Sequence, residues 1–375
     1  MNKKFKRILI VQPFGIGDVL FITPLIRALS KAGAERIDLL LGSRTREVFE
    51  HNPFIFKIYE RDKTEVRGFK ARFKRWVQRR RLYFVLNRNR YDVFIDLSFS
   101  RGYGWLGKFV FWIPVRIGFD FKNRGNFLTH KIQLPAGLKD KPVSDYYLDL
   151  LSFIGIQPEQ PASLDLFLSL EDERYAEAIL SRLNAPNFFI TVALGGGESW
   201  GKDARLKHWP VKHFAELIRK ILERTQNSRP SMLIVGTSSD QPKGEFLKDC
   251  LKACSIHNLC GQTSIRVAAA IMKRAGLFIG NDGGLLHVAS AVGTPLIGLF
   301  GPVDPLVYGP YPKRNLSLAV THTGPECRPC YQSFKYQNDC VHVACLNSLD
   351  PGQVFEKMCE SGFFEMLKSN VATHS

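Results

Sequence analysis

The chain has 375 residues, 45% of them hydrophobic, and carries a formal net charge of +17 at pH 7. This length is enough for two domains, and the hydrophobic fraction is ordinary for a soluble globular protein. No apolar run approaches the roughly 20 residues of a membrane span, and the apolar stretch 8–11 is too short for a signal peptide, so we expect a cytoplasmic protein.

The first half of the chain alternates short apolar runs with helical patterns. We expect strands at 8–11, 37–41, 54–59, 91–97 and 115–119, and helices at 19–32, 45–50 and within 63–90. Such alternation predicts a parallel sheet with helices on both faces.

A glycine-rich turn follows the first strand. Gly15 and Gly17 resemble the start of a dinucleotide fingerprint, but Leu20 stands where the third glycine belongs, which argues against an NAD site. Asp18 falls at the expected N-cap of the next helix. It is either a capping residue or a general base for an incoming hydroxyl.

The segment 63–90 is strongly basic, with eleven Lys or Arg residues against one acid. Phe69, Phe73 and Trp76 follow helical spacing within it, which predicts a basic amphipathic helix. Its apolar stripe either packs against its own domain or helps to meet an anionic partner, which would be a phosphorylated glycolipid at a membrane or a nucleic acid. The candidate contacts to that partner are Arg79, Arg80 and Arg81.

A stretch rich in proline and glycine, 135–161, separates the halves and contains one expected helix at 144–154. We place the domain boundary between residues 170 and 171, a second domain over 171–350, and a C-terminal helix and tail over 351–375. In the second domain we expect strands at 188–194, 232–235, 277–279 and 295–300, and helices at 211–223, 241–253, 265–275 and from 285 onward.

Three loops that follow strands of the second half carry residues suited to a nucleoside diphosphate. Lys207, after the glycines at 195–197, can bind a phosphate as a point charge, although it could equally be a solvated loop lysine. Asp240 could accept ribose hydroxyls or cap a helix. The third loop, Asp282 to Leu285, leads into a helix N-terminus that favours a phosphate, and its plainer interpretation is a capped turn.

Four cysteines lie close together near the C-terminus: Cys327, Cys330, Cys340 and Cys345. Their spacing could hold a structural zinc ion. The cytosol argues against two stable disulfides, so the alternative is free or redox-labile thiols.

Three stretches, 7–29, 206–218 and 278–305, together resemble glycosyltransferase family 9, the ADP-heptose:lipopolysaccharide heptosyltransferases. The resemblance implies an α/β fold of GT-B architecture, in which two Rossmann-like domains face a cleft. It also implies inverting, metal-independent transfer of heptose from ADP-heptose to the lipopolysaccharide inner core, with no required cofactor. The resemblance assigns Asp18 as the catalytic base, Lys207 as the phosphate-binding lysine, Asp240 as the ribose contact, and Asp282, Gly283, Gly284 and Leu285 as the donor loop.

The resemblance also implies partners and a location. We expect a nucleotide-sugar donor, an anionic lipopolysaccharide-core acceptor and the inner-membrane surface as partners, with no nucleic acid, and a peripheral position on the inner face of the membrane. Two other functions remain open. The same fold could use another nucleotide sugar or glycan acceptor, or the chain could be a non-catalytic α/β protein that binds membranes or nucleic acid.

Overall fold

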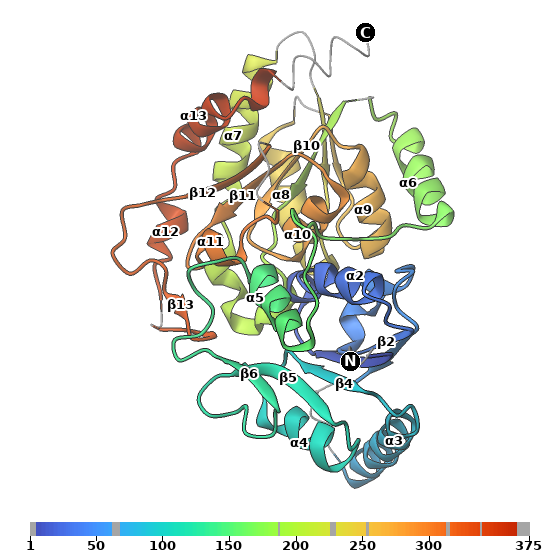
Figure 1. Cartoon of the computed structure of the whole chain (residues 1–375). Coiled ribbons are helices and arrows are strands. Elements are labelled where there is room, and N and C mark those ends of the chain that lie inside the picture. The colour runs from blue at the N-terminus through green and yellow to red at the C-terminus, as the bar shows by residue number, and fades with distance from the viewer. Residues whose placement is uncertain are drawn as a thin grey trace. The chain divides into compact units, whose positions relative to one another are not determined.

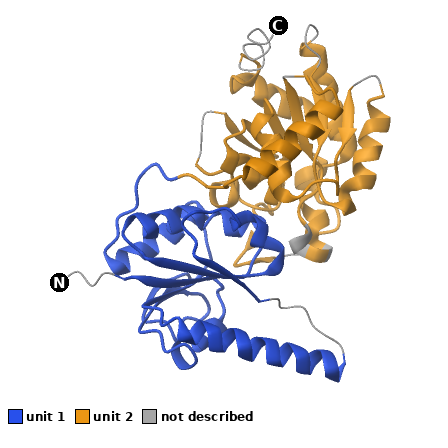
Figure 2. Ribbon diagram, turned by 90° about the vertical axis from the view of Figure 1, so that its right-hand side faces the viewer, with its two compact units in different colours: residues 1–162 blue, residues 163–375 orange. Residues whose placement is uncertain are grey.

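The computed structural model describes residues 5–61, 68–186, 188–225, 230–252, 255–312, 316–337 and 340–365. The chain divides into two compact units, residues 1–162 and 163–375 (Figure 2), whereas we placed the boundary at 170/171. Helix α6 (Leu170–Arg182) packs against α9 (Ile265–Arg274) in the second unit, and this packing explains the earlier division.

Unit 1 is built on a six-stranded parallel sheet with the order β3-β2-β1-β4-β5-β6. Its central strands consist mostly of buried apolar residues, as expected for a sheet that helices cover on both faces. The strand order reverses between β1 and β4. The strands are β1 (Arg7–Gln12), β2 (Arg36–Leu41), β3 (Lys57–Glu60), β4 (Val93–Asp96), β5 (Val115–Asp120) and β6 (His130–Gln133).

The helical segments of unit 1 differ from the expected ones near the N-terminus. The helix predicted at 19–32 is two helices, because the ring of Pro24 would clash with the Leu20 carbonyl and has no N–H to donate to it. The Thr23 hydroxyl donates to that carbonyl instead, at 2.8 Å. The segments are α1 (Ile16–Leu20), α2 (Thr23–Lys31), η1 (Ser43–Phe49), α3 (Phe69–Arg88), α4 (Arg101–Phe109), α5 (Val143–Asp149) and η2 (Leu150–Ile154).

The sheet of unit 2 has the strand order β12-β11-β10-β7-β8-β9. Read from the β9 edge, this is the same order as in unit 1, and the strands are again parallel. Here the order reverses between β7 and β10. Its strands are β7 (Phe189–Ala193), β8 (Ser231–Ile234), β9 (Ile256–Asn258), β10 (Leu277–Asn281), β11 (Leu296–Phe300) and β12 (Ser317–Thr321), and a small hairpin, β13 (Tyr331–Gln332) and β14 (Lys335–Tyr336), follows.

Helices cover both faces of the unit 2 sheet (Figure 1). One face packs against α7 (Val211–Arg224) and α13 (Pro351–Glu360), so α13 belongs to the unit 2 core. The other face packs against α6 and α9. The remaining helical segments are η3 (Glu198–Lys207), η4 (Ser238–Asp240), α8 (Gln241–Cys250), α10 (Gly284–Val292), α11 (Pro305–Tyr308) and α12 (Ala344–Asn347).

The two units confirm the expected architecture of two Rossmann-like domains. In each sheet, the point where the strand order reverses is where loops leaving neighbouring strands diverge and leave room for a ligand. None of the helices in the described part of the chain is both long and apolar enough to cross a membrane.

Candidate functional site

The loops that leave β7 and β10 meet at the point where the strand order of unit 2 reverses. A Cβ atom at Gly283 would lie 3.1 Å from the carbonyl carbon of Gly196, and one at Gly196 would lie 2.8 Å from the Cβ of Lys207. The two loops and the end of η3 can approach this closely because two of the contacting residues have no side chain. The structure thus brings two of the loops predicted from the sequence together.

Lys207 and Asp282 form a buried ion pair at this junction. The Lys207 Nζ lies 2.6 Å from Asp282 Oδ2, and both side chains are 5% exposed. Burial removes most of the water that would otherwise screen the two charges, so this pair is held more firmly than a surface pair. The interpretation of Lys207 as a solvated loop lysine is therefore wrong.

Helix α10 begins beside this ion pair. Gly283 is its N-cap in an extended conformation, and the first backbone bond of the helix runs from the Leu286 N–H to the Gly283 carbonyl. Asp282 therefore does not cap the helix, which the interpretation of this loop as a capped turn would require, because its carboxylate pairs with Lys207. The first N–H groups of a helix have no acceptor within the helix, and they favour an anion such as phosphate.

Asp240 lies next to the same junction but has a structural task. It is the last residue of η4 rather than the end of a strand, and its Oδ2 accepts bonds from the N–H and hydroxyl of Thr237 at 3.3 and 3.1 Å. Lys243 donates to Oδ1 at 2.9 Å. A Cβ at Gly195 would lie 2.5 Å from the Asp240 carboxylate, so this acid borders the β7 loop while it also caps a helix.

Two residues that the sequence analysis did not select complete the junction. Asn281 is buried and links two loops: its Oδ1 accepts from the Trp209 N–H at 3.0 Å, and its Nδ2 donates to the Leu194 carbonyl at 2.9 Å. His287 lies one turn into α10. Burial lowers its pKa to about 4, an effect that the nearby Asp282 opposes and Lys207 reinforces. The pattern of an Asn before an Asp-Gly-Gly turn is the only sequence signal for Asn281.

In unit 1, Asp18 lies after β1, where the strand order of that sheet reverses. It is the third residue of α1, not the N-cap, which is Gly15. Its Oδ2 accepts the Gly15 N–H at 3.1 Å, so the carboxylate is held by the turn that precedes the helix. The side chain is half-buried. The capping role of Asp18 is thus observed. Asp18 also lies at the carboxyl edge of the sheet, which is where a catalytic base would need to be.

Two further carboxylates end strands of the same sheet: Asp96 ends β4 and Asp120 ends β5. Asp96 accepts from the Ser98 N–H at 3.0 Å and from its hydroxyl. Burial would raise the pKa of Asp120, but the Lys131 ammonium and the Gly125 N–H outweigh it and hold this pKa below its usual value. Asp96 and Asp120 are both buried, whereas Asp18 is half-buried, which leaves Asp18 as the stronger candidate at this edge.

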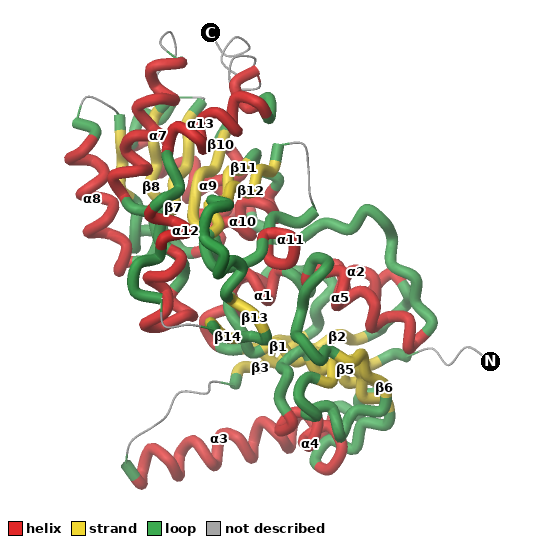
Figure 3. Tube along the Cα trace, turned by 90° about the vertical axis from the view of Figure 1, so that its left-hand side faces the viewer, coloured by secondary structure: helices red, strands yellow, loops and turns green. Residues whose placement is uncertain are grey.

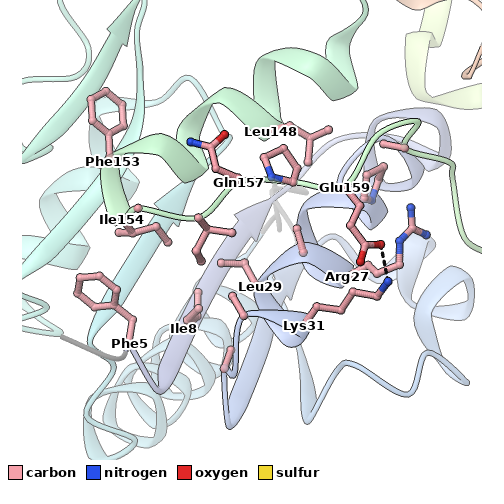
Figure 4. Close-up of a pocket in the computed structure, with 18 residues that line it drawn as sticks. Phe5, Ile8, Arg27, Leu29, Lys31, Leu148, Phe153, Ile154, Gln157 and Glu159 are labelled. Atoms are coloured by element: carbon pink, nitrogen blue, oxygen red, sulfur yellow. Dashed lines mark hydrogen bonds and ion pairs between the residues drawn. The ribbon is translucent and has the colours of Figure 1, made fainter. Parts of the chain in front are cut away.

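A surface hollow of about 660 Å³ lies elsewhere in unit 1 (Figure 4). Its apolar lining includes Phe5, Ile8 and Phe153, and the charged residues Lys31 and Glu159 at its rim form an ion pair with each other. Ile8 lies near the start of β1, whereas Asp18 follows the end of that strand. The hollow is therefore separate from the candidate site.

The family model named Glycosyltransferase family 9 (heptosyltransferase) matches residues 79–339. The chain belongs to glycosyltransferase family 9. This match includes Lys207, Asp240 and the 282–285 loop, whereas Asp18 lies before it.

Individual relatives agree with this assignment. The chain is 24% identical over 330 residues, 85% of its length and 90% of the relative's, to lipooligosaccharide heptosyltransferase 2 of Haemophilus ducreyi. It is 34% identical over 104 residues to the protein of the same name from Haemophilus influenzae, a match that spans 28% of that relative and 26% of this chain. The structure of Escherichia coli ADP-heptose lps heptosyltransferase II has the same fold, with a TM-score of 0.68, 20% identity and coverage of 97% of this chain and 99% of that one.

The basic helix of this family 9 protein is α3, and its residues 63–67 lie outside the described part of the chain. Phe69, Phe73 and Trp76 are exposed, so the interpretation that this stripe packs against its own domain is wrong. Leu82 and Leu86 make the contact with the core instead. Of the candidate anion contacts, Arg80 and Arg81 are exposed and Arg79 is half-buried.

The cysteine cluster does not form a metal site in this structure. Across the described residues, no three His, Cys, Asp or Glu side chains are placed so that they could hold a metal ion. Cys327 is exposed, Cys340 is half-buried, and Cys330 and Cys345 are buried. Burial raises the pKa of the Cys345 thiol to about 11. The predicted zinc site therefore gains no support from the geometry.

Proposed function

We propose that this protein transfers heptose from ADP-heptose to the inner core of lipopolysaccharide, with inversion at the anomeric carbon and without a metal ion. Family membership and the two heptosyltransferase relatives support this proposal. The observation that carries it is the buried Lys207–Asp282 pair beside the N-terminus of α10. An ammonium, a carboxylate and free helix N–H groups are the groups that a sugar diphosphate requires.

Each part of the donor has a proposed contact in unit 2. The diphosphate binds to the Lys207 ammonium and to the N–H groups at Gly283, Gly284 and Leu285. The Asp282 carboxylate accepts hydrogen bonds from hydroxyls of the sugar. Asp240, which borders the β7 loop, accepts a ribose hydroxyl. Asp282 holds the Lys207 ammonium, so the ion pair restricts the rotamer of the lysine that would contact the phosphate.

The reaction then follows from charge movement. Asp18 takes the proton of the acceptor hydroxyl while that oxygen attacks the anomeric carbon, and the bond from this carbon to the diphosphate oxygen breaks. Positive charge develops on the sugar ring, and negative charge builds on the departing ADP. Lys207 and the α10 N–H groups stabilise that negative charge, a role that a divalent ion fills in other transferases.

The exposed arginines of α3 give the acceptor a place to approach. The acceptor that we propose is anionic, and α3 presents Arg80 and Arg81 to solvent. We place the protein at the cytoplasmic face of the inner membrane, where such an acceptor is held. Replacing Arg79, Arg80 and Arg81 with Gln should raise the KM for the acceptor and leave the affinity for the donor unchanged.

Substitution of Asp18 tests the mechanism directly. Asp18→Asn should lower kcat about 10²-fold or more and leave the Kd for ADP-heptose nearly unchanged, because the donor contacts lie in unit 2. Asp172→Asn is a matched control, since Asp172 also occupies the third position of a helix and accepts the N–H of its N-cap, Ser169. Near-normal turnover of Asp18→Asn would remove Asp18 from the role of base.

Chelation tests the metal-independent part of the proposal. EDTA should leave initial transfer rates unchanged, because Lys207 and the helix N–H groups supply the positive charge. Rapid inactivation that magnesium or manganese reverses would contradict this. Slow inactivation that only zinc reverses would support a structural zinc ion at the four cysteines.

The donor sugar needs its own measurement. A thermal-shift panel of nucleotides and nucleotide sugars should show the largest stabilisation with ADP species, because a bound ligand stabilises the folded state by mass action. A preference for uridine or guanosine species would favour the alternative, a transferase of the same fold that uses another donor.

A further inference from the structure

The exposed aromatic side chains of unit 1 concentrate on α3, α4 and the residues just after α4. Among the tryptophans whose side chains the structure describes, all the exposed ones lie between residues 69 and 112: Trp76, Trp105 and Trp112. A tryptophan left in water at three places along two adjacent helices is unusual, because proteins bury or partner large apolar surfaces.

Helix α3 presents four of its aromatic residues on the side away from the core. At 100° per residue, Phe69, Phe73, Trp76 and Phe84 fall on one face, and Leu82 and Leu86, which pack on the core, fall on the opposite face. Phe69 is 84% exposed and Trp76 is 51% exposed. The face is therefore an outward apolar stripe.

Cations are interleaved with this stripe. The Arg80 guanidinium lies 4.7 Å from the centre of the Trp76 ring, and that of Arg88 lies 5.5 Å from Phe84. The twenty residues of α3 include eight Lys or Arg and no Asp or Glu. The surface is thus apolar and positively charged together, which selects a partner that is apolar and negatively charged.

Helix α4 adds a second aromatic cluster that the sequence analysis did not identify. Trp105 and Phe109 lie one turn apart with ring centres 5.7 Å apart, and the Lys108 ammonium lies 5.0 Å from the Phe109 ring. Trp112, just beyond the helix, is 75% exposed. Tyr83 of α3 packs on Phe111, just after α4, and both helices contribute to one core cluster, so they belong to one side of unit 1 (Figure 3).

We propose that the α3–α4 surface, defined as residues 69–88 and 101–112, inserts its aromatic side chains into the headgroup layer of an anionic lipid bilayer. Tryptophan favours this layer because its ring is apolar and its N–H is polar. Each Lys or Arg near an anionic membrane adds electrostatic attraction to it. Basic helices with an aromatic face bind in the plane of such a surface.

The proposal deepens the proposed function, since a bilayer contact would bring the enzyme to a lipid-held acceptor. It does not depend on the reaction, because vesicles without donor or acceptor suffice to test it. The full chain is mixed with phosphatidylcholine vesicles that contain or lack phosphatidylglycerol. Binding is measured by flotation, and insertion is measured by quenching of tryptophan fluorescence with lipids brominated on their acyl chains.

The decisive variant is Trp105→Ser/Phe109→Ser/Trp112→Ser. It should bind anionic vesicles about tenfold or more weakly than the wild type and lose most of the brominated-lipid quenching. The matched control is Leu306→Ser/Val341→Ser, which removes two exposed apolar side chains of unit 2 and should change neither readout. If the triple variant does not fold, as judged by circular dichroism and by thermal unfolding, Trp112→Ser alone is used and should reduce the quenching.

Three outcomes would overturn the proposal. Wild-type flotation without quenching would mean that charge alone holds the protein on the vesicle. Unchanged binding of a folded triple variant would show that Trp105, Phe109 and Trp112 do not insert into the bilayer, and that α3 and α4 do not act as one surface. Concentration-dependent self-association in the absence of lipid, abolished by the same substitutions, would instead make the surface an interface between two copies of the chain.

Discussion

The side-chain amide of Asn281 accepts a hydrogen bond from the backbone N–H of Trp209, with 3.0 Å between Oδ1 and N. Because Nδ2 of the same amide donates to the Leu194 carbonyl at 2.9 Å, one buried side chain fixes three segments of unit 2. Lys207 and Asp282 each lie within two residues of these anchor points. Asn281 therefore sets the geometry of the proposed donor site without any need to touch the donor.

Asn281→Ala should affect both stability and nucleotide binding. It would leave the Trp209 N–H and the Leu194 carbonyl buried without partners, at a cost of about 2–4 kcal/mol in the free energy of unfolding. ADP binding, measured by calorimetry, should weaken because the Lys207 and Asp282 loops lose their common anchor. Thr191→Val is the control, since it removes a buried bond to Leu277 farther from those loops. Equal losses of ADP affinity in both variants would contradict a specific role for Asn281.

The Lys207–Asp282 pair predicts a non-additive double-mutant cycle. Lys207→Met and Asp282→Asn should each lower the free energy of unfolding by about 3 kcal/mol, since each changes one member of a buried pair, and the charge left by Lys207→Met has no partner. The double variant should recover part of this loss, whereas ADP binding should stay weak because the phosphate contact is gone. Urea unfolding of the four proteins measures the coupling, and additive effects would show that the two charges act independently.

His287 predicts how stability depends on pH. Its folded pKa of about 4 lies below the ordinary value of 6.5, so the unfolded chain binds the proton more readily between these values. The stabilisation from neutral His287 is complete above about pH 6.5 and is lost as the pH falls towards about 4. Urea unfolding across this range should give a shallower pH slope for His287→Gln than for the wild type. Identical slopes for the two proteins would mean that other titrating groups determine how stability depends on pH in this range.

Two glycines of α10 should respond differently to alanine. Gly283→Ala places a methyl group 3.1 Å from the Gly196 backbone, so the β7 and β10 loops must separate and ADP binding should weaken. Gly293 ends the helix with a φ of +83°, so Gly293→Ala should cost about 1 kcal/mol of stability with ADP affinity unchanged. Calorimetry with ADP separates the two effects. Unchanged ADP affinity in Gly283→Ala would show that the close approach is not needed.

Much of the fold could be predicted because buried parallel strands are local apolar runs, and the runs at 8–11 and 277–279 lie within β1 and β10. Helix α4 was missed because its sequence contains three glycines, which lower helix propensity. One of them, Gly107, lies so close to the Phe94 ring that a Cβ would be 3.0 Å away. The packing of α4 on β4 joins residues far apart in the sequence, and it outweighs the low helix propensity of the glycines.

The candidate site shows the same limit. Glycine-rich loops after strands predicted where Lys207 and Asp282 lie, because this pattern is local. The pairing of Lys207 with Asp282 depends on which strands are neighbours, and so does the bridging role of Asn281. The sequence alone did not predict that β7 lies beside β10. The sequence also left undecided whether the aromatic stripe of α3 is exposed, because helical spacing identifies a face of the helix but not what covers that face.

The repeated strand order has a consequence for how the chain melts. Each unit has a sheet and a hydrophobic core of its own, so each can unfold as a separate cooperative unit. A calorimetric scan of the full chain should then resolve two heat-absorption peaks, with ADP moving only the peak that belongs to residues 163–375. Heat damage could therefore remove one half of the enzyme while the other half stays folded, so that loss of activity would precede loss of most secondary structure.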